Sequence, residues 1–240
     1  MRFLKAGDSA LIVELGNEIS PIINYKLKKI TDYLDSLKHK AIKDLLPTYR
    51  SIIVYYDPMI LSFDELKNMV EQNCTADDDS ILSVQKEIIE VPVLYGGEYG
   101  PDIENIASHN NLSVEEVIKI HTSGEYLVYM LGFTPGFPYL GGMDKRIATP
   151  RLTTPRTKIP AGSVGIAGEQ TGLYPIESPG GWQLLGRTPL NFFDPMKENP
   201  FIVTSGQYIK FTAISKKEYD EITEQVKNGT YTVKHYLKED

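Results

Sequence analysis

The segment from Gly132 to Pro189, called here the Gly/Pro segment, constrains the fold more than any other part of the chain. It holds 11 of the 19 glycines and 8 of the 15 prolines. Proline fixes φ and removes a backbone donor, so the segment cannot form a long helix. Large apolar residues are interleaved with the glycines and prolines, which is not typical of a linker: Phe133, Phe137, Tyr139, Leu140, Tyr174, Trp182, Leu184 and Leu185. The pattern predicts short strands joined by turns, as in a sandwich or a closed barrel.

The first third of the chain has the pattern of a small α+β unit. Alternating apolar residues predict a hairpin over 2–15 and strands over 42–46 and 49–56. A helix is expected to follow Ser20 as its cap, with Pro21 as the first helical residue. A small α+β unit is therefore predicted for this part.

The domain boundary is predicted at the short acidic stretch 75–80. It follows a helix that a capping box, Ser62-x-x-Glu65, is expected to open. We therefore predict a small α+β domain over 1–80 and a second domain over 81–240. A surface loop within a single domain is the alternative for this stretch.

The second domain is expected to begin with mixed structure before it becomes all-β. Strand patterns cover 87–94 and 126–131, and Asp102 is placed to cap a helix that extends through Ile106. A second helix is expected to end near His121. The capping boxes that predict two of the helices in this domain are Ser113-x-x-Glu116 and Ser215-x-x-Glu218.

Composition indicates a globular protein with small-molecule or protein partners. The net charge of -7 and the sequence pI of about 5.2 argue against nucleic-acid binding, which is typical of basic surfaces. The single cysteine, Cys74, excludes an intrachain disulfide and a multi-cysteine zinc site, and it fits a reducing cytosol. The chain shows no signal peptide at its start and no apolar run of about 18 residues, so we expect a cytoplasmic protein without a membrane span.

Searches for self-contained catalytic motifs are negative. The chain has no P-loop pattern and no H-E-x-x-H, and its four histidines are scattered, so no metal site is inferred. The glycines at 162, 165 and 168 have the wrong spacing for a dinucleotide loop. Ala161 stands where a nucleophile elbow around Ser163 would need its first glycine. These absences favour a chain that does not carry out its chemistry alone.

Cationic, amide and aromatic side chains in the Gly/Pro segment are candidates for holding a small anionic substrate. Arginine suits bidentate capture of a carboxylate or phosphate. The predicted substrate-binding residues are Arg156, Lys158, Gln170, Tyr174, Trp182 and Arg187. Arg151 is a further cation of the same segment. For each residue the alternative is structural, because arginines often form surface ion pairs and aromatic rings often fill a core.

His121 is the predicted general acid or base. The ordinary pKa of imidazole lies near neutrality, and His121 is the only histidine that directly precedes the Gly/Pro segment. Asp144 is the second candidate for proton transfer. The alternative for His121 is a structural role near the end of a helix, where an imidazolium interacts favourably with the helix dipole.

Long stretches of the chain resemble one known family. The runs are VPVLYGGEYGPD, GFTPGFPYLGGM, TPRTKIPAGSVGIAGEQTGLYPIESPGGWQLLGRTP and FFDP. They are similar to the family that comprises allophanate hydrolase subunit 1, KipI and the B subunit of 5-oxoprolinase. The resemblance extends from Arg2 to about Phe211, and it implies an α+β two-layer N-terminal domain followed by a mainly-β, cyclophilin-like barrel domain.

The resemblance also implies an activity with partner chains. The B subunit of 5-oxoprolinase works with the A and C subunits to open 5-oxo-L-proline to L-glutamate, coupled to ATP hydrolysis. Since this chain has no P-loop pattern, ATP is expected to be bound by the complex rather than by this chain alone. The expected enzyme is therefore a complex in which this chain, inactive alone, contacts a small-molecule substrate.

Two other functions stay open on the same resemblance. A chain similar to KipI would inhibit a sporulation histidine kinase by binding it, without chemistry of its own. A carboxyltransferase-like component would act on a urea-type or amide substrate. The fold allows all three functions, because fold alone does not determine function.

Overall fold

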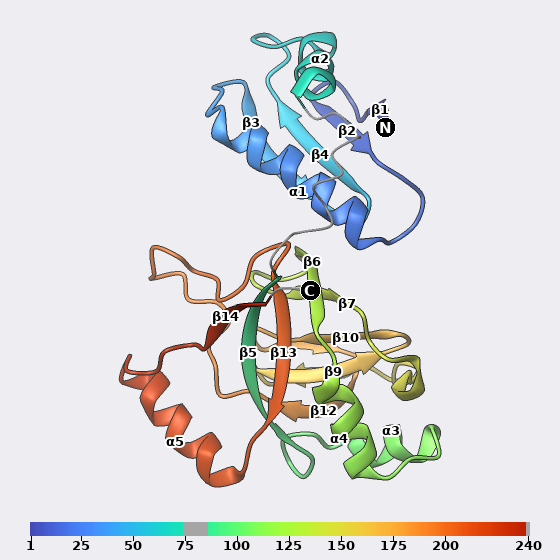
Figure 1. The fold of residues 1–240 in the computed structure, drawn as a ribbon, viewed down its shortest axis with the longest axis vertical. Helices are drawn as coiled ribbons and strands as arrows, with labels where there is room; N and C mark the ends of the chain where they lie inside the picture. Colours follow the sequence, from blue (N-terminus) through green and yellow to red (C-terminus); the bar gives the residue numbers. More distant parts are fainter. Residues whose placement is uncertain (74–85, 239–240) are drawn as a thin grey trace. The chain divides into compact units, whose positions relative to one another are not determined.

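The computed structural model divides the chain into two compact units, each with its own hydrophobic core (Figure 1). The structure describes residues 1–73 and 86–238. The predicted linker over 75–80, and with it the predicted domain boundary, lies outside the described residues.

The N-terminal unit is a four-stranded antiparallel sheet with two helices. Among its described residues the strand order is β1-β2-β4-β3. Leu27 and Ile30 of the first helix and Leu66 of the second pack with the strand residues Val13 and Val54 in one core. The sheet and the helices therefore form the two layers that the resemblance implies. The elements are β1 (Arg2–Lys5), β2 (Ala10–Glu14), α1 (Pro21–Ser36), β3 (Ile42–Pro47), β4 (Ser51–Tyr56) and α2 (Phe63–Asn73).

The C-terminal unit is built on a closed barrel. Within residues 86–238, seven strands follow the order β12-β9-β10-β7-β6-β13-β5, and pairing of β12 with β5 closes the ring. The barrel is mixed, because β13 and β5 run parallel while the other pairs are antiparallel. The strands are β5 (Lys86–Tyr95), β6 (Tyr126–Leu131), β7 (Pro138–Gly141), β9 (Ser163–Ala167), β10 (Gln170–Leu173), β12 (Gln183–Arg187) and β13 (Tyr208–Ala213).

This closed barrel is consistent with the cyclophilin-like fold that the resemblance implies. Around it lie a two-stranded ribbon, an added edge strand and several helices (Figure 1). The ribbon pairs β8 (Arg156–Ile159) with β11 (Ser178–Gly180), and β14 (His235–Lys238) adds to β5. The helices are α3 (Ile103–His109), α4 (Val114–Ser123), the short 3-10 helix η2 (Lys145–Ile147) and α5 (Lys216–Lys227).

Neighbouring residues of the barrel strands face opposite sides of the wall, as the period of two in a strand requires. On β9 and β10, Val164, Ile166 and Leu173 belong to the barrel core. Ala167 and Tyr174 belong instead to a separate aromatic cluster on the outside. The Gly/Pro segment therefore supplies both the barrel wall and the cluster packed on its outer face.

Helix starts were predicted well where the signal is local. The three predicted capping boxes are confirmed, and in each a serine hydroxyl accepts from the backbone N–H three residues later while the glutamate accepts from the serine backbone. They are Ser62–Glu65, Ser113–Glu116 and Ser215–Glu218. The prediction for Ser20 is wrong in part: Pro21 does begin α1, but the Ser20 side chain makes no capping hydrogen bond.

The capping prediction for Asp102 is also wrong. Asp102 occupies the position before α3, but its carboxylate makes no capping bond. It accepts instead from the Arg156 guanidinium at 2.7 Å and from the Leu184 backbone N–H at 2.7 Å. Charge-assisted bonds to a guanidinium are stronger than an ordinary cap, so the carboxylate turns away from its own helix.

His121 lies in the barrel core and not at an open site. Its side chain is fully buried, stacked on Phe211 with ring centroids 4.6 Å apart. Nδ1 lies 2.8 Å from the Tyr95 hydroxyl, and Nε2 lies 2.9 Å from Thr171 Oγ1. Thr171 Oγ1 is also 3.2 Å from the Gly165 carbonyl and donates its proton there. Nε2 therefore carries the proton of a neutral ring, and Nδ1 accepts from Tyr95.

The prediction of His121 as a general acid or base assumed a pKa near neutrality, and the burial of the ring corrects that assumption. Desolvation lowers the pKa of His121 to about 3 and raises that of Tyr95, so the imidazole stays neutral and the phenol stays protonated. With both ring nitrogens engaged by protein hydroxyls, the arrangement joins α4 to β5 and β10. It offers no free nitrogen to a substrate.

We expect His121 to make the protein less stable as the pH falls. Below pH 6.5 the unfolded chain takes up a proton that the native imidazole accepts only near its pKa of about 3. The free energy of unfolding should therefore drop by roughly 1.4 kcal/mol per pH unit across that window on account of this residue. Urea unfolding of wild type and His121→Gln at several pH values measures this, since the stability gap should narrow as the pH falls.

His109→Gln is the matched control, because His109 is exposed on α3. Its stability should follow wild type at every pH. An NMR titration that shows the native His121 ring charging near neutral pH would contradict a buried neutral imidazole.

Candidate functional site

An aromatic cluster covers the outer face of the barrel. Trp182, 7% exposed and the only tryptophan, lies over Gly165 and Gly172 of β9 and β10. A Cβ on Gly172 would lie 2.9 Å from Cζ3 of the indole, and one on Gly165 would lie 3.3 Å from the Trp182 Cβ. Trp182 can pack this closely on the strands only because these positions have no side chain. Glycine spacing in the Gly/Pro segment therefore serves to seat an aromatic ring.

Phe137 is the centre of this cluster, which we call the aromatic platform. Its ring makes edge-to-face contacts with Tyr174 at 5.5 Å and with Trp182 at 5.8 Å, distances typical of favourable aromatic pairs. Tyr139 packs on the same ring at 5.3 Å. Phe133, at 5.6 Å, continues the platform to the surface, where it is 66% exposed and holds a φ of 60°.

Two guanidinium groups stand beside the platform. Arg156 binds Asp102 and also contacts the Trp182 carbonyl at 3.5 Å. Its ion pair is partly buried, with side chains 30% and 11% exposed. The Arg151 guanidinium lies 5.9 Å from the Trp182 ring, and no carboxylate of the described residues pairs with it. Arg156 is therefore fixed and neutralised, whereas the charge of Arg151 is not neutralised by a described carboxylate.

Tyr174 is buried within the platform. Burial raises the pKa of Tyr174 to about 12, although Arg151, the Trp182 backbone N–H and Arg156 each act to lower it. The hydroxyl is therefore protonated at neutral pH and serves as a neutral hydrogen-bonding group. The site thus combines a largely buried aromatic cluster, the Arg151 guanidinium, which pairs with no carboxylate among the described residues, and one neutral hydroxyl.

The structure brings together part of the predicted substrate-binding set. Arg156, Tyr174 and Trp182 meet at the platform. Gln170 is on the same strand as Gly172, two residues away, and so faces the same side of the wall. The site roles of these residues stay predictions, because geometry alone does not show a substrate.

The other predicted residues lie elsewhere. Lys158 is exposed on the β8–β11 ribbon and pairs with Glu177 at 3.0 Å. Arg187 ends β12 and contacts Tyr99 rather than the platform. Asp144 binds Arg146 at the surface, and that hydrogen bonding lowers the pKa of its carboxyl.

Asp102, Gln183 and Asn105 lie at the platform but were not predicted from the sequence as site residues. Asp102 fixes Arg156, and Gln183 donates to the Pro150 carbonyl at 3.0 Å while accepting from Asn105 at 2.9 Å. The contacts of Gln183 hold α3 and the loop that contains Pro150 and Arg151 against β12. No local signal could have found them, since each joins residues at least 33 positions apart.

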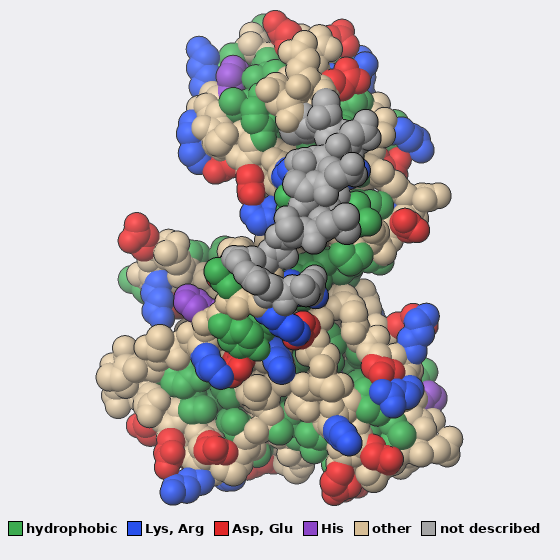
Figure 2. Space-filling view, in the orientation of Figure 1, with side chains coloured by type: hydrophobic (Ala, Val, Ile, Leu, Met, Phe, Trp, Pro, Cys, Tyr) green, Lys and Arg blue, Asp and Glu red, His purple; other side chains and the backbone are tan. Residues whose placement is uncertain are grey.

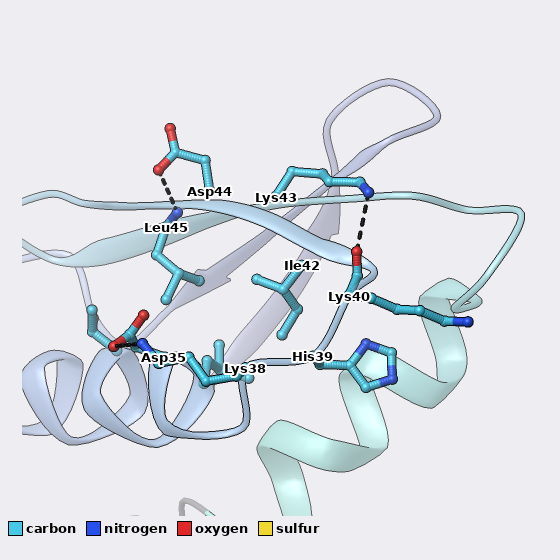
Figure 3. Close-up of a pocket in the computed structure, with 10 residues that line it drawn as sticks. Asp35, Lys38, His39, Lys40, Ile42, Lys43, Asp44 and Leu45 are labelled. Carbon is cyan, nitrogen blue, oxygen red and sulfur yellow. Dashed lines mark hydrogen bonds and ion pairs between the residues drawn. The ribbon is translucent and has the colours of Figure 1, made fainter.

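A cavity of about 570 Å³ lies in the N-terminal unit, between α1 and β3. Figure 3 shows Ile42 and Leu45 pointing toward α1, with charged residues around them. Lys38 binds Asp35 at 2.7 Å, and Lys43 donates to the Lys40 carbonyl at 3.0 Å. Because these charges are largely satisfied within the unit and none of the predicted site residues lines the cavity, we do not place the site there.

Two surface features bear on the class of ligand: metal-binding clusters and the distribution of charge. Among residues 1–73 and 86–238, no three His, Cys, Asp or Glu side chains are arranged to hold a metal ion. Figure 2 shows acidic and basic side chains interspersed on the visible face of each unit. No helix in the described part of the chain has the length and apolar character needed to cross a membrane.

Comparison with known proteins identifies the family. A model of the carboxyltransferase domain, subdomain C and D, matches residues 1–203, so the chain belongs to that family. It is 47% identical to the B subunit of 5-oxoprolinase from Bacillus subtilis (strain 168), over 91% of this chain and 95% of that protein. The resemblance drawn from the sequence motifs is thereby confirmed.

More distant relatives contain a stretch similar to this chain within longer polypeptides. Urea amidolyase of Lachancea kluyveri is 25% identical over 98% of this chain, which matches only 15% of that protein. The solved structure of TTHA0988 aligns with a TM-score of 0.77 at 33% identity, covering 86% of this chain and 40% of that one. In these relatives the stretch similar to this chain is continuous with additional polypeptide.

We expect Gly172→Ala to disrupt the platform. The added Cβ would press on the Trp182 indole, so the free energy of unfolding should fall by about 1–3 kcal/mol. Because Trp182 is the only tryptophan, its fluorescence emission should shift in the same variant. Gly132→Ala is the control, since its Cβ would lie 3.4 Å from Tyr139, an ordinary contact. Unchanged stability and emission in Gly172→Ala would contradict the close seating of the indole.

Proposed function

We propose that this chain is the B-type component of an ATP-dependent 5-oxoprolinase that opens 5-oxo-L-proline to L-glutamate. The observation that carries the proposal is the 47% identity, over 91% of the chain, to a protein named as the B subunit of 5-oxoprolinase. In this proposal the chain works with the A and C subunits. In some relatives the stretch similar to this chain is part of a longer polypeptide. This supports the proposal that the chain needs further polypeptide to act.

The chemistry explains why ATP and partners are needed. A lactam is a poor electrophile. Transfer of the γ-phosphoryl group of ATP to its oxygen, with release of ADP, would make the ring carbon open to attack by water. The ring C–N bond would then break, and phosphate would leave. Since the sequence has no P-loop pattern, we assign ATP binding to the complex and not to this chain alone. This chain would contribute groups that hold the substrate and stabilise developing negative charge.

The aromatic platform is the proposed substrate wall. A five-membered lactam is flat and largely apolar apart from its carboxylate and amide. Because Trp182 and Phe137 are buried, the lactam would lie against Phe133, the exposed end of the platform, with Phe137 packed behind it. Arg151, which no described carboxylate neutralises, would take the substrate carboxylate. Arg156 would shape that position from its fixed pair with Asp102, and Gln170 would offer an amide on the same side.

A second candidate function is a carboxyltransferase-like component that acts on a urea-type or amide substrate. The matched carboxyltransferase model and the urea amidolyase relative favour it. A biotin-dependent partner would then be required, and the reconstituted complex would consume bicarbonate. Inhibition of a sporulation histidine kinase stays a prediction from the resemblance.

Reconstitution with the A and C subunits tests the leading proposal. We expect 5-oxoproline-dependent ATP hydrolysis only when this chain is present. Arg151→Gln should raise the KM for 5-oxoproline by about tenfold or more, because it removes one charge-assisted hydrogen bond. Lys158→Gln, a change of the same charge at an exposed ion pair, should leave KM close to wild type.

Arg156 needs a paired design, because removing it alone leaves a partly buried Asp102 without its cation. The double variant Asp102→Asn with Arg156→Gln removes both charges together. Loss of activity in Arg156→Gln that the double variant restores would show that the pair supports the fold. Full activity of the complex without this chain would refute the proposed function.

A further inference from the structure

Arg187 lies in a cluster separate from the aromatic platform. It ends β12, where it faces Ser163 of β9 and Leu94 of β5 in the strand ladders. Its guanidinium lies 5.3 Å from the Tyr99 ring centroid. Strand geometry puts Arg187 roughly 10 Å along β12 from Leu184, the residue bonded to Asp102. Arg187 and Arg156, the arginine that binds Asp102, therefore lie in different surroundings.

The hydrogen bonds around Arg187 are incomplete. Arg187 Nε and Ser163 Oγ are buried and have no hydrogen-bond partner among the described protein groups. Ser163 is fully buried, and the two residues lie opposite each other in the ladder, so their side chains share one face. No carboxylate in the described part of the chain pairs with Arg187. Both groups can donate, which calls for an acceptor that the described residues do not supply.

A second cation and two phenols surround the same position. Lys216, the first residue of α5, places its ammonium 5.9 Å from the Tyr99 ring centroid. Tyr219 packs on Tyr99 with ring centroids 4.8 Å apart. Lys216 also binds Asp220 at 2.6 Å, so Arg187, Lys216 and Asp220 together leave one positive charge.

We propose that Arg187, Tyr99 and Lys216 form a binding site for an oxyanion, a phosphate or carboxylate group of a ligand. A guanidinium stacked on an aromatic ring keeps its two terminal nitrogens for a bidentate contact, which suits both groups. Lys216 and Lys217 each pair with a carboxylate four residues later, and Lys216 differs in lying 5.9 Å from the Tyr99 ring centroid. The site is argued from Arg187, Tyr99 and Lys216 alone, so it does not depend on the proposed 5-oxoprolinase activity.

Binding to the purified full chain tests the site without any partner. Calorimetric titration with inorganic phosphate and, separately, with acetate should show saturable binding of at least one of them. Arg187→Gln should weaken that binding about tenfold or more, and Lys216→Gln should weaken it to a lesser degree. Lys217→Gln is the matched control, with the same charge change on the adjacent, 86% exposed side chain.

The two titrants separate the sources of the oxyanion. Tighter phosphate binding supports a phosphoryl ligand, and tighter acetate binding supports a carboxylate ligand. Arg187→Lys keeps the charge and most of the side-chain packing but removes the guanidinium that makes a bidentate contact. It is therefore the test if Arg187→Gln fails to fold. Absence of saturable binding to both anions would overturn the proposal. Unchanged binding in the arginine variants, or equal weakening in Lys216→Gln and Lys217→Gln, would do the same.

Discussion

The barrel closes at one seam, and the rest of the C-terminal unit depends on it. There β12 pairs with the end of β5, with Gly186 opposite Tyr95. A Cβ on Gly186 would lie 2.6 Å from Val93 Cγ1, and one on Gly100 would overlap the Leu185 carbonyl. Two backbones can approach this closely only where side chains are absent. Glycine at these positions is therefore a condition for closing the barrel.

The same seam positions both candidate sites. The loop after β5 is tied to β12 by backbone bonds from Gly96 to Leu185 at 3.1 Å and from Asp102 to Leu184 at 2.9 Å. Asp102, at the end of this loop, orients Arg156 beside the platform. Tyr99, within the loop, lies beneath Arg187. One short glycine-rich loop thus supplies a carboxylate to one arginine and an aromatic ring to another.

Sequence reasoning succeeded where the controlling interaction is local. Each capping box joins residues three positions apart, so Ser113 and Glu116 could be recognised without knowing the fold. It failed where a residue far away in the chain makes the stronger interaction. Asp102 has the spacing of a helix cap, yet its carboxylate goes to Arg156, 54 positions away. His121 has an ordinary pKa near neutrality in isolation, and only the surrounding core lowers it to about 3.

By itself the sequence determined the two-layer unit, the barrel and the family, because these depend on periodicity, on turn residues and on long shared motifs. It also indicated that the Gly/Pro segment carries the functional surface. Only the tertiary structure decided which residues of that segment act together. It set Trp182 on Gly172, neutralised Arg156, left Arg151 and Arg187 without carboxylates among the described residues, and buried His121. The physical reason is that charge pairing and burial arise between strands and loops that are far apart in the chain, and spacing along the sequence does not encode them.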